Sequence, residues 1–355
     1  MPENYIQPVT DRQQCYTCHK TVTGKKKLSK CSKCHAITYC GKECQLDDFA
    51  RHKWNCVPVM VTEYQGKGWG LGATRDIKMG EVIFLDKPVM KVPKNPSVSA
   101  DLPVLIQSIE KQIKKMSSEA KLQFDKLVRK DHCDKEESIK ALGIIADHSK
   151  TIGDWCILFL NVALINHSCS PNATLESIQK EGETWDEVKA IKDISKGEEI
   201  TKFYARCGCK EMDERFTIKA FGCNSQERRL VLKKHFRFDC KCCVCSGNVP
   251  EQEDIIKELV ELHRRFDSNQ TRKRKEAPFW AKQVKIADQI VDLTLKLYIG
   301  NIEDKVCSLK LLLATAGDAQ DEVHFKKAVD GLRKIAKDTG IRSVMQFCEN
   351  FSSLN

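Results

Sequence analysis

The most informative stretch of this chain is Asn166-His167-Ser168-Cys169-Ser170-Pro171-Asn172. It places an amide, an imidazole and a thiol directly after the apolar run 157–165. Polar groups of this kind are costly to bury without hydrogen-bond partners. Two interpretations are therefore open: a core element that delivers these groups to a functional site, or a buried strand that ends in a polar turn. The rest of the chain favours the first.

The length and composition are those of an ordinary soluble protein with a hydrophobic core. The chain has 355 residues, of which 41% are hydrophobic and 30% charged, and its length predicts about two to three domains. The N-terminal residues lack the charged and apolar regions of a signal peptide, so we expect none. No apolar stretch reaches the length that crosses a bilayer, and we expect no membrane association.

The cysteine content points to metal rather than to disulfides. The chain has 19 cysteines, and in a reducing compartment clustered cysteines bind metal more often than they pair. This also changes the charge. The formal net charge of +10 counts every cysteine as neutral, whereas eleven zinc-bound thiolates and three divalent ions would lower it to roughly +5. A mildly basic protein of this kind does not require a nucleic-acid partner.

Periodicity and composition predict an α+β fold with four regions. Residues 12–57 are rich in cysteine and lysine and need a metal to fold. Residues 60–205 read as short strands with a helical insert at about 100–150, where Leu105, Ile109, Ile113 and Met116 follow helical spacing. A hairpin-like turn is expected at 181–183. Residues 206–247 form a second cysteine-rich region, and 251–355 read as a helical domain.

Eight residues of the first region fall into four consecutive pairs with two or three residues between the members of each. The pairs are Cys15 and Cys18, Cys31 and Cys34, Cys40 and Cys44, and His52 and Cys56. Zinc takes four such ligands in a tetrahedron, so eight ligands predict two closed, structural sites. Chance clustering would not produce this regularity.

The order and spacing of these pairs resemble the MYND zinc finger. The resemblance implies a cross-braced arrangement in which Cys15, Cys18, Cys40 and Cys44 hold one ion and Cys31, Cys34, His52 and Cys56 hold the other. It also implies that the finger binds proline-rich partner peptides. The run Lys25-Lys26-Lys27 suits an acidic partner, although a solvated charge run is the simpler interpretation.

Three further motifs occur in order: the glycine-rich 66–73, Asn166-His167-Ser168-Cys169, and Gly197-Glu198-Glu199-Ile200-Thr201-Lys202-Phe203-Tyr204. A glycine-rich turn lets the backbone approach a ligand, but alone it is a weak signal. Together the three motifs resemble a SET methyltransferase domain. With the finger, residues 12–246 resemble the SMYD family of protein-lysine methyltransferases, and the domain order is most similar to the divergent arthropod-type members with an N-terminal MYND finger.

The resemblance implies a site for S-adenosyl-L-methionine. Its cofactor-binding residues would be Lys67, Gly68, Trp69, Asn166, His167, Tyr204 and Phe238. Tyr204 would also be the catalytic tyrosine, Phe238 would stack near the adenine, and residues 198–204 would thread through the SET pseudoknot. Phe203, Phe236 and Phe238 are candidate walls of a lysine channel.

The chemistry fits such a channel. Methyl transfer from a sulfonium to an amine is an in-line displacement that needs a neutral amine. A free lysine, with a pKa of about 10.4, is neutral in roughly one molecule in a thousand near pH 7.4. A narrow apolar channel disfavours the ammonium and lowers that pKa. Proximity and alignment would then supply most of the rate.

A third zinc site is expected in the second cysteine-rich region. Cys240, Cys242 and Cys245 supply three ligands, and a structural zinc needs a fourth. The resemblance implies that Cys169 is the fourth, and it leaves Cys243 outside the site.

The chain departs from the family pattern at several points. Phe236 stands where the family usually has a channel tyrosine, which leaves the methylation state open. An upstream asparagine that contacts the cofactor has no clear match near 146–148. The link 205–226 holds Cys207, Cys209 and Cys223, which either bind another metal or belong to an ordinary loop. The C-terminal helical region is shorter than the family's TPR-like domain.

The prediction for function is an S-adenosylmethionine-dependent protein-lysine N-methyltransferase that acts on a histone or another protein. The alternative is an adaptor or transcriptional co-repressor that works through the MYND finger with a weak or inactive SET domain. Direct DNA binding is a more distant third. We expect a monomer in the cytoplasm and nucleus, with Arg272-Lys273-Arg274-Lys275 as a candidate nuclear signal.

Overall fold

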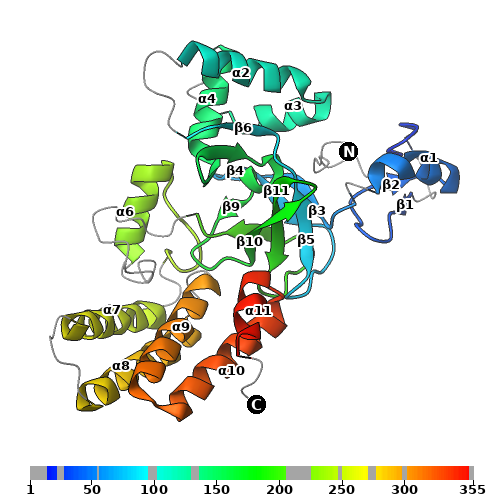
Figure 1. Cartoon of the computed structure of the whole chain (residues 1–355). Helices are drawn as coiled ribbons and strands as arrows, with labels where there is room; N and C mark the ends of the chain where they lie inside the picture. Colours follow the sequence, from blue (N-terminus) through cyan, green and yellow to red (C-terminus); the bar gives the residue numbers. More distant parts are fainter. Residues whose placement is uncertain are drawn as a thin grey trace. The chain divides into compact units, whose positions relative to one another are not determined.

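The computed structural model describes residues 14–21, 28–53, 56–94, 102–128, 136–204, 225–246, 250–270, 277–297 and 302–351. The lysine run 25–27, Cys207, Cys209, Cys223 and the basic run 272–275 lie outside these residues. The chain forms two compact units (Figure 1). The first contains Met1–Asn166 and Leu175–Ile200, and the second contains His167–Thr174 and Thr201–Asn355. The polypeptide therefore passes from the first unit to the second directly between Asn166 and His167.

The N-terminal finger of the first unit is small. The strands β1 (Ser29–Lys30) and β2 (Thr38–Tyr39) pair antiparallel, and α1 (Lys42–His52) follows them. Its only core among the described residues is a cluster of ligand cysteines with Ile37 and Tyr39. The Tyr39 hydroxyl donates to Asp48 at 2.7 Å. So few apolar side chains cannot hold a fold, which agrees with the expected need for metal.

The strands of the following region build three small sheets. Their orders are β3-β4-β12-β9, β10-β11-β5 and β6-β8-β7. The bounds are β3 Val59–Tyr64, β4 Gly68–Ala73, β5 Val82–Asp86, β6 Met90–Pro93, β7 Lys150–Ile152, β8 Trp155–Leu158, β9 Asn166–His167, β10 Ala173–Lys180, β11 Glu183–Ala190 and β12 Glu199–Lys202.

Two tight hairpins fix the register in the first unit. Strands β3 and β4 pair from Val59↔Ala73 to Tyr64↔Gly68. The β10–β11 turn places Glu181 at φ 55° and Gly182 at φ 77°, the left-handed conformations that a two-residue hairpin loop requires. The hairpin expected at 181–183 is therefore confirmed. Strand β11 also pairs with β5, where Asp186 lies opposite Asp86.

The helical insert is confirmed and consists of three helices. These are α2 (Leu102–Lys115), α3 (Ser118–Asp125) and α4 (Glu137–His148). The four residues at helical spacing, Leu105, Ile109, Ile113 and Met116, are 8%, 0%, 1% and 8% exposed. This buried stripe is what an amphipathic helix presents to a core. Figure 1 shows the three helices gathered beside β6.

The apolar run 157–165 is not one buried strand. Strand β8 ends at Leu158, and a short helix, α5 (Leu160–Ala163), precedes β9. The buried carboxylate of Asp86 explains the change, because it accepts the Val162 N–H at 2.8 Å and the Asn161 amide at 2.7 Å. Burial raises the pKa of Asp86 to about 7, and these two donors oppose that rise. The start of α5 is thus set by a residue 75 positions earlier.

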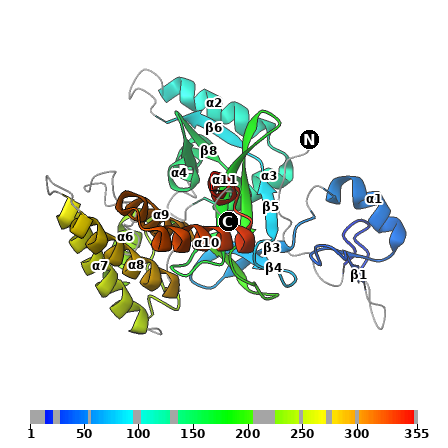
Figure 2. The same cartoon turned by 60° about the horizontal axis from the view of Figure 1, so that its bottom comes forward.

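The second unit is mainly helical, as expected for residues after 251. Its helices are α6 (Ser225–Phe236), α7 (Pro250–Gln270), α8 (Ala277–Lys296), α9 (Ile302–Ala319), α10 (Glu322–Thr339) and α11 (Arg342–Glu349). Figures 1 and 2 show α7 to α10 side by side, and the core of this unit contains buried leucines and isoleucines. Among the described residues, no helix is long and apolar enough to cross a membrane.

Candidate functional site

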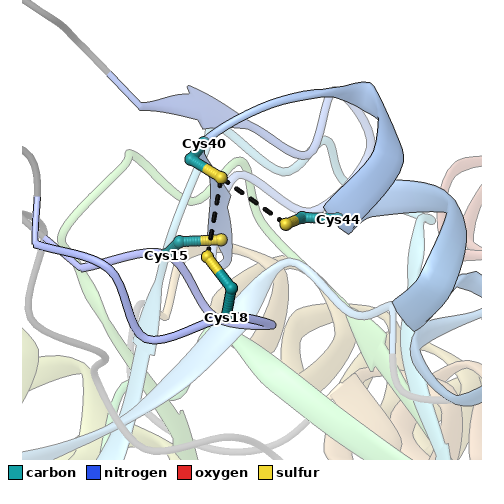
Figure 3. A group of neighbouring side chains, drawn as sticks. All are labelled: Cys15, Cys18, Cys40 and Cys44. Carbon is teal, nitrogen blue, oxygen red and sulfur yellow. Dashed lines mark hydrogen bonds between the residues drawn. The ribbon is translucent and has the colours of Figure 1, made fainter.

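The first zinc site joins the first and third ligand pairs of the finger. Cys15, Cys18, Cys40 and Cys44 place their sulfur atoms within 4.8 Å of one another, and Figure 3 shows the four side chains pointing to a common centre. The Cys18–Cys40 and Cys40–Cys44 sulfur distances are 3.6 and 3.5 Å. A tetrahedral zinc with Zn–S bonds of about 2.3 Å separates its sulfurs by about 3.8 Å, so the set fits zinc.

The second zinc site joins the second and fourth ligand pairs of the finger, as the cross-braced arrangement predicts. Cys31, Cys34, His52 and Cys56 form the second group. The His52 Nε2 atom lies 3.4 Å from the sulfur of Cys31 and 3.6 Å from that of Cys34. Tetrahedral zinc predicts a nitrogen–sulfur separation of about 3.6 Å. Contact with Cys56 and with the His52 imidazole lowers the pKa of Cys34 to about 3 against the opposing effect of burial, which favours the thiolate that zinc binds.

The third site lies in the second unit. Cys169 lies 4.0 Å from Cys240 and 3.5 Å from Cys245, measured between sulfurs, and Cys242 completes the group. Cys243 is exposed and is not part of it. Across the described residues, the only three groups with metal-binding geometry are these. Each cluster supplies four protein ligands, which fill a tetrahedral zinc site, so the three clusters indicate three structural zinc ions.

A buried arginine accompanies the third site and was not expected from the sequence. Arg228 of α6 is 1% exposed, and its guanidinium lies 3.2 Å from the Glu253 carboxylate. Burial lowers the pKa of Arg228, but the thiolates of Cys169 and Cys245 outweigh this and raise it. Four thiolates on a divalent ion leave two negative charges in the core, and a buried cation offsets them.

The glycine-rich motif forms the β3–β4 hairpin in the first unit. Gly66 and Gly68 have φ of 75° and 79°, which a residue with a side chain adopts with difficulty. Gly70 is required for a different reason. A Cβ atom at Gly70 would lie 2.6 Å from the Asn166 Nδ2 atom and 2.9 Å from Cδ2 of Tyr64. The glycine therefore allows Asn166 to approach the hairpin backbone.

Asn166 and Lys67 converge on one carboxylate. The Asn166 amide donates to Glu199 Oε1 at 2.9 Å and to the Trp69 carbonyl at 3.3 Å. The Lys67 Nζ lies 2.5 Å from Glu199 Oε2. Burial and the Glu199 charge raise the pKa of the neighbouring Tyr64 to about 12, so this phenol is neutral. Glu199 therefore binds both Asn166 and Lys67, two residues predicted to bind the cofactor. The sequence did not indicate this role for Glu199.

This polar set fits the amino-acid end of S-adenosylmethionine, which carries an ammonium and a carboxylate. The Asn166 Oδ1 atom accepts no hydrogen bond from the described residues, and with the Trp69 carbonyl it offers acceptors for the ammonium. Lys67 is 44% exposed and offers a cation for the carboxylate. The Trp69 ring is 39% exposed and lies 4.7 Å from the Lys126 ammonium.

Aromatic rings surround His167 in the second unit. Its ring centroid lies 5.3 Å from Phe203, 5.4 Å from Tyr204 and 5.8 Å from Phe238. Tyr204 also contacts Phe236, at 5.3 Å. The structure therefore brings Tyr204, the predicted catalytic residue, together with the candidate channel residues Phe203, Phe236 and Phe238. An apolar aromatic wall of this kind disfavours a charged amine.

His167 holds this cluster through both ring nitrogens. Its Nδ1 accepts the Tyr204 backbone N–H at 3.1 Å, and its Nε2 lies 3.3 Å from the Cys169 sulfur. The Ser168 N–H donates to the Lys202 carbonyl at 3.0 Å. The side chain of His167 is only 6% exposed. Its imidazole therefore links the third zinc site to Tyr204 and fixes the tyrosine's position.

Comparison with known families matches two regions of the chain. The MYND finger matches residues 15–56 and the SET domain matches residues 68–205. The finger precedes the whole SET match, in the order that the motifs predicted.

Several lysine methyltransferases of other organisms are similar to this chain. Human N-lysine methyltransferase SMYD2 is 26% identical over 279 residues, covering 74% of this chain and 57% of the relative. Histone-lysine N-methyltransferase ASHR1 of Arabidopsis thaliana is 24% identical and covers 71% and 50%. Mouse histone-lysine N-methyltransferase Smyd1 is 23% identical and covers 73% and 56%. The chain thus spans little more than half the length of these relatives.

Three findings point to the same kind of protein, a SET domain combined with a zinc finger. They are the two matched domains, the three clusters with zinc geometry and these relatives. The chain therefore combines a MYND finger with a SET domain and is similar to proteins of the SMYD family.

Proposed function

We propose that the protein is an S-adenosylmethionine-dependent protein-lysine N-methyltransferase. The observation that carries the proposal is the pair Asn166-His167. Asn166 binds the Trp69 carbonyl of the glycine hairpin, and together they offer hydrogen-bond acceptors to the cofactor. The next residue, His167, accepts the Tyr204 backbone N–H on its Nδ1 atom at 3.1 Å. A single dipeptide thereby orders the residues for cofactor binding and the residue for catalysis.

When bound, S-adenosylmethionine would supply an electrophilic methyl group on a sulfonium. Lys67, the Trp69 carbonyl and Asn166 would hold its amino-acid end, and Phe238 would pack on its adenine. The Tyr204 hydroxyl would orient the accepting amine, which would lose its proton to solvent before the methyl carbon leaves the sulfonium sulfur and bonds to the amine nitrogen. Phe203 and Phe236 exclude water and favour the neutral amine. In this scheme alignment provides most of the rate, with no strong base required.

The proposed substrate is a lysine of a histone or another protein. The names of the relatives include both N-lysine and histone-lysine methyltransferases. We also propose that the protein acts as a monomer in the cytoplasm and nucleus, where such substrates occur.

The finger supports a second proposed function, the capture of a partner peptide. Two large apolar side chains of α1, Leu46 and Phe49, are 61% and 58% exposed. Exposed apolar side chains that are adjacent on a helix mark an interaction surface. A proline-rich segment suits it, because a preformed extended peptide loses little entropy on binding. An adaptor role would use this surface whether or not the SET domain is active.

The test of the enzymatic proposal is transfer of label from methyl-labelled S-adenosylmethionine to core histones and to fractionated cell proteins. Wild type should transfer label to lysine, and Tyr204→Phe should reduce the rate by at least a hundredfold while the zinc content stays at three ions. No transfer by fully zinc-loaded wild type, together with binding of proline-rich peptides that Phe49→Ala abolishes, would establish the adaptor role instead.

A further inference from the structure

A groove of about 290 Å³ runs through the first unit between the finger and the β10-β11-β5 sheet. The finger contributes Lys33 and Lys53, strand β5 contributes Val82 to Leu85, and the β10–β11 hairpin contributes Lys180 and Trp185. None of the residues assigned to the cofactor lines it. The exposed Leu46 and Phe49 of α1 do not line it either, so it is separate from both sites proposed above.

The rim of the groove is strongly basic. Four cationic side chains line it, Lys33, Lys53, Arg75 and Lys180, against one carboxylate, Glu81. Arg75 already engages that carboxylate, through Nη1 at 3.2 Å and through a shorter contact from Nη2. Among the described residues, neither Lys33 nor Lys180 has a carboxylate within ion-pair distance. The groove therefore holds uncompensated positive charge, which an anionic ligand would neutralise.

The floor of the groove is apolar. Val82 is 41% exposed although it belongs to a strand, and Leu85 is partly exposed beside it. The Lys180 ammonium lies 4.4 Å from the ring centroid of Trp185, which also lines the groove. Basic groups around exposed aliphatic side chains match a ligand that alternates acidic and apolar groups. A polynucleotide would leave the aliphatic floor without a partner.

The two walls are fixed to each other. The Arg75 Nε donates to the Lys33 carbonyl at 3.0 Å, and the Thr74 hydroxyl donates to the Cys34 carbonyl. Lys33 lies between the ligands Cys31 and Cys34, and Arg75 also binds Glu81 next to β5. Walls held in this way lose little entropy when a ligand binds.

We propose that this groove binds an acidic segment of a partner protein, with carboxylates on Lys33 and Lys180 and an apolar side chain on Val82. The finger then has two recognition surfaces, one on α1 and one shared with the sheet. The inference does not depend on methyl transfer and would hold for an inactive SET domain.

The test is fluorescence anisotropy of the full-length, zinc-loaded chain with a labelled short peptide of alternating Glu and Leu. We expect binding that weakens as salt rises. The double variant Lys33→Gln, Lys180→Gln should bind about fivefold to tenfold more weakly, the sum of two partly exposed ion pairs. Val82→Ser should weaken binding about threefold to fivefold through lost apolar contact.

The control is Lys196→Gln, an exposed lysine of the same unit outside this groove, which should bind like wild type. Lys180→Glu provides a variant far from the zinc ligands, and it should bind at least tenfold more weakly even if changes at Lys33 disturb the finger. Equal binding of wild type and Lys180→Glu would overturn the proposal. So would a short DNA duplex that binds with the same dependence on Lys180 while the acidic peptide does not bind.

Discussion

Gly70→Ala tests the packing of the hairpin against Asn166. The added methyl group would lie 2.6 Å from the Asn166 Nδ2 atom and 2.9 Å from Cδ2 of Tyr64. Both distances are well below the 3.5–4.0 Å of an ordinary contact, so both side chains must move by about an ångström. Asn166 cannot do so and keep its hydrogen bonds to the Trp69 carbonyl at 3.3 Å and to Glu199 at 2.9 Å.

The expected losses of stability and of cofactor affinity follow from these contacts. Overpacking a filled site costs about 1–3 kcal/mol of unfolding free energy. The displaced amide also loses a hydrogen bond to a charged group, about 1.5–3 kcal/mol. Because Asn166 is assigned to the cofactor, most of the second loss should appear as binding. We expect the affinity for S-adenosylmethionine to fall by about tenfold to a hundredfold.

Isothermal titration calorimetry measures the affinity, and thermal unfolding measures the stability. The matched control is Gly317→Ala in α9, where an added Cβ meets Phe325 at an ordinary 3.7 Å. This variant should bind like wild type and be equally or slightly more stable, because alanine favours a helix over glycine. Unchanged affinity and unchanged stability of Gly70→Ala would show that Asn166 does not pack on the hairpin as described.

Three further predictions concern Cys169, Glu199 and Arg228. Cys169→Ser should reduce the zinc content from three ions to two by metal analysis and weaken cofactor binding through the loss of the His167 contact; three retained ions would refute the third zinc site. Glu199→Ala should weaken S-adenosylmethionine binding by about threefold to tenfold in calorimetry, since Lys67 is partly exposed and its ion pair is screened; an affinity equal to wild type would show that Glu199 does not position the residues that bind the cofactor. Arg228→Met should lower the unfolding free energy by about 3 kcal/mol in a denaturant titration and speed zinc loss to a chelator; unaltered stability would mean that the buried cation does not offset the thiolates.

The sequence predicts the elements whose causes are local. The ligand pairs of the finger are short-range patterns, and their chemistry needs no tertiary information. The stripe from Leu105 to Met116 is likewise a helix signal, and all four residues proved buried. The turn at Glu181 and Gly182 follows from the residues that a two-residue hairpin loop tolerates.

Long-range contacts account for what the sequence did not predict. The run 157–165 contains a helical turn because Asp86 caps it across the core. Glu199 acts with Lys67, which lies 132 positions away in the chain. The burial of Arg228 depends on the third zinc site and on Glu253. In each case a polar side chain is held by a partner that no local pattern identifies.

His167 shows the same limit within a motif that was correctly singled out. Its assignment to the cofactor stays a prediction, and the structure adds that its ring nitrogens contact the Tyr204 backbone and the Cys169 sulfur. Spacing shows that a histidine belongs to a motif, but the direction of its ring depends on tertiary neighbours. The imidazole connects the third zinc site to the backbone of Tyr204, the predicted catalytic residue.

The most direct test of the account is a calorimetric titration of the zinc-loaded chain with S-adenosyl-L-methionine, for wild type and Asn166→Ala. We expect a single site per chain in the wild type and an affinity at least tenfold lower in the variant, with both proteins equally folded. Absence of binding to folded wild type with three zinc ions, or equal affinity of the two proteins, would contradict it.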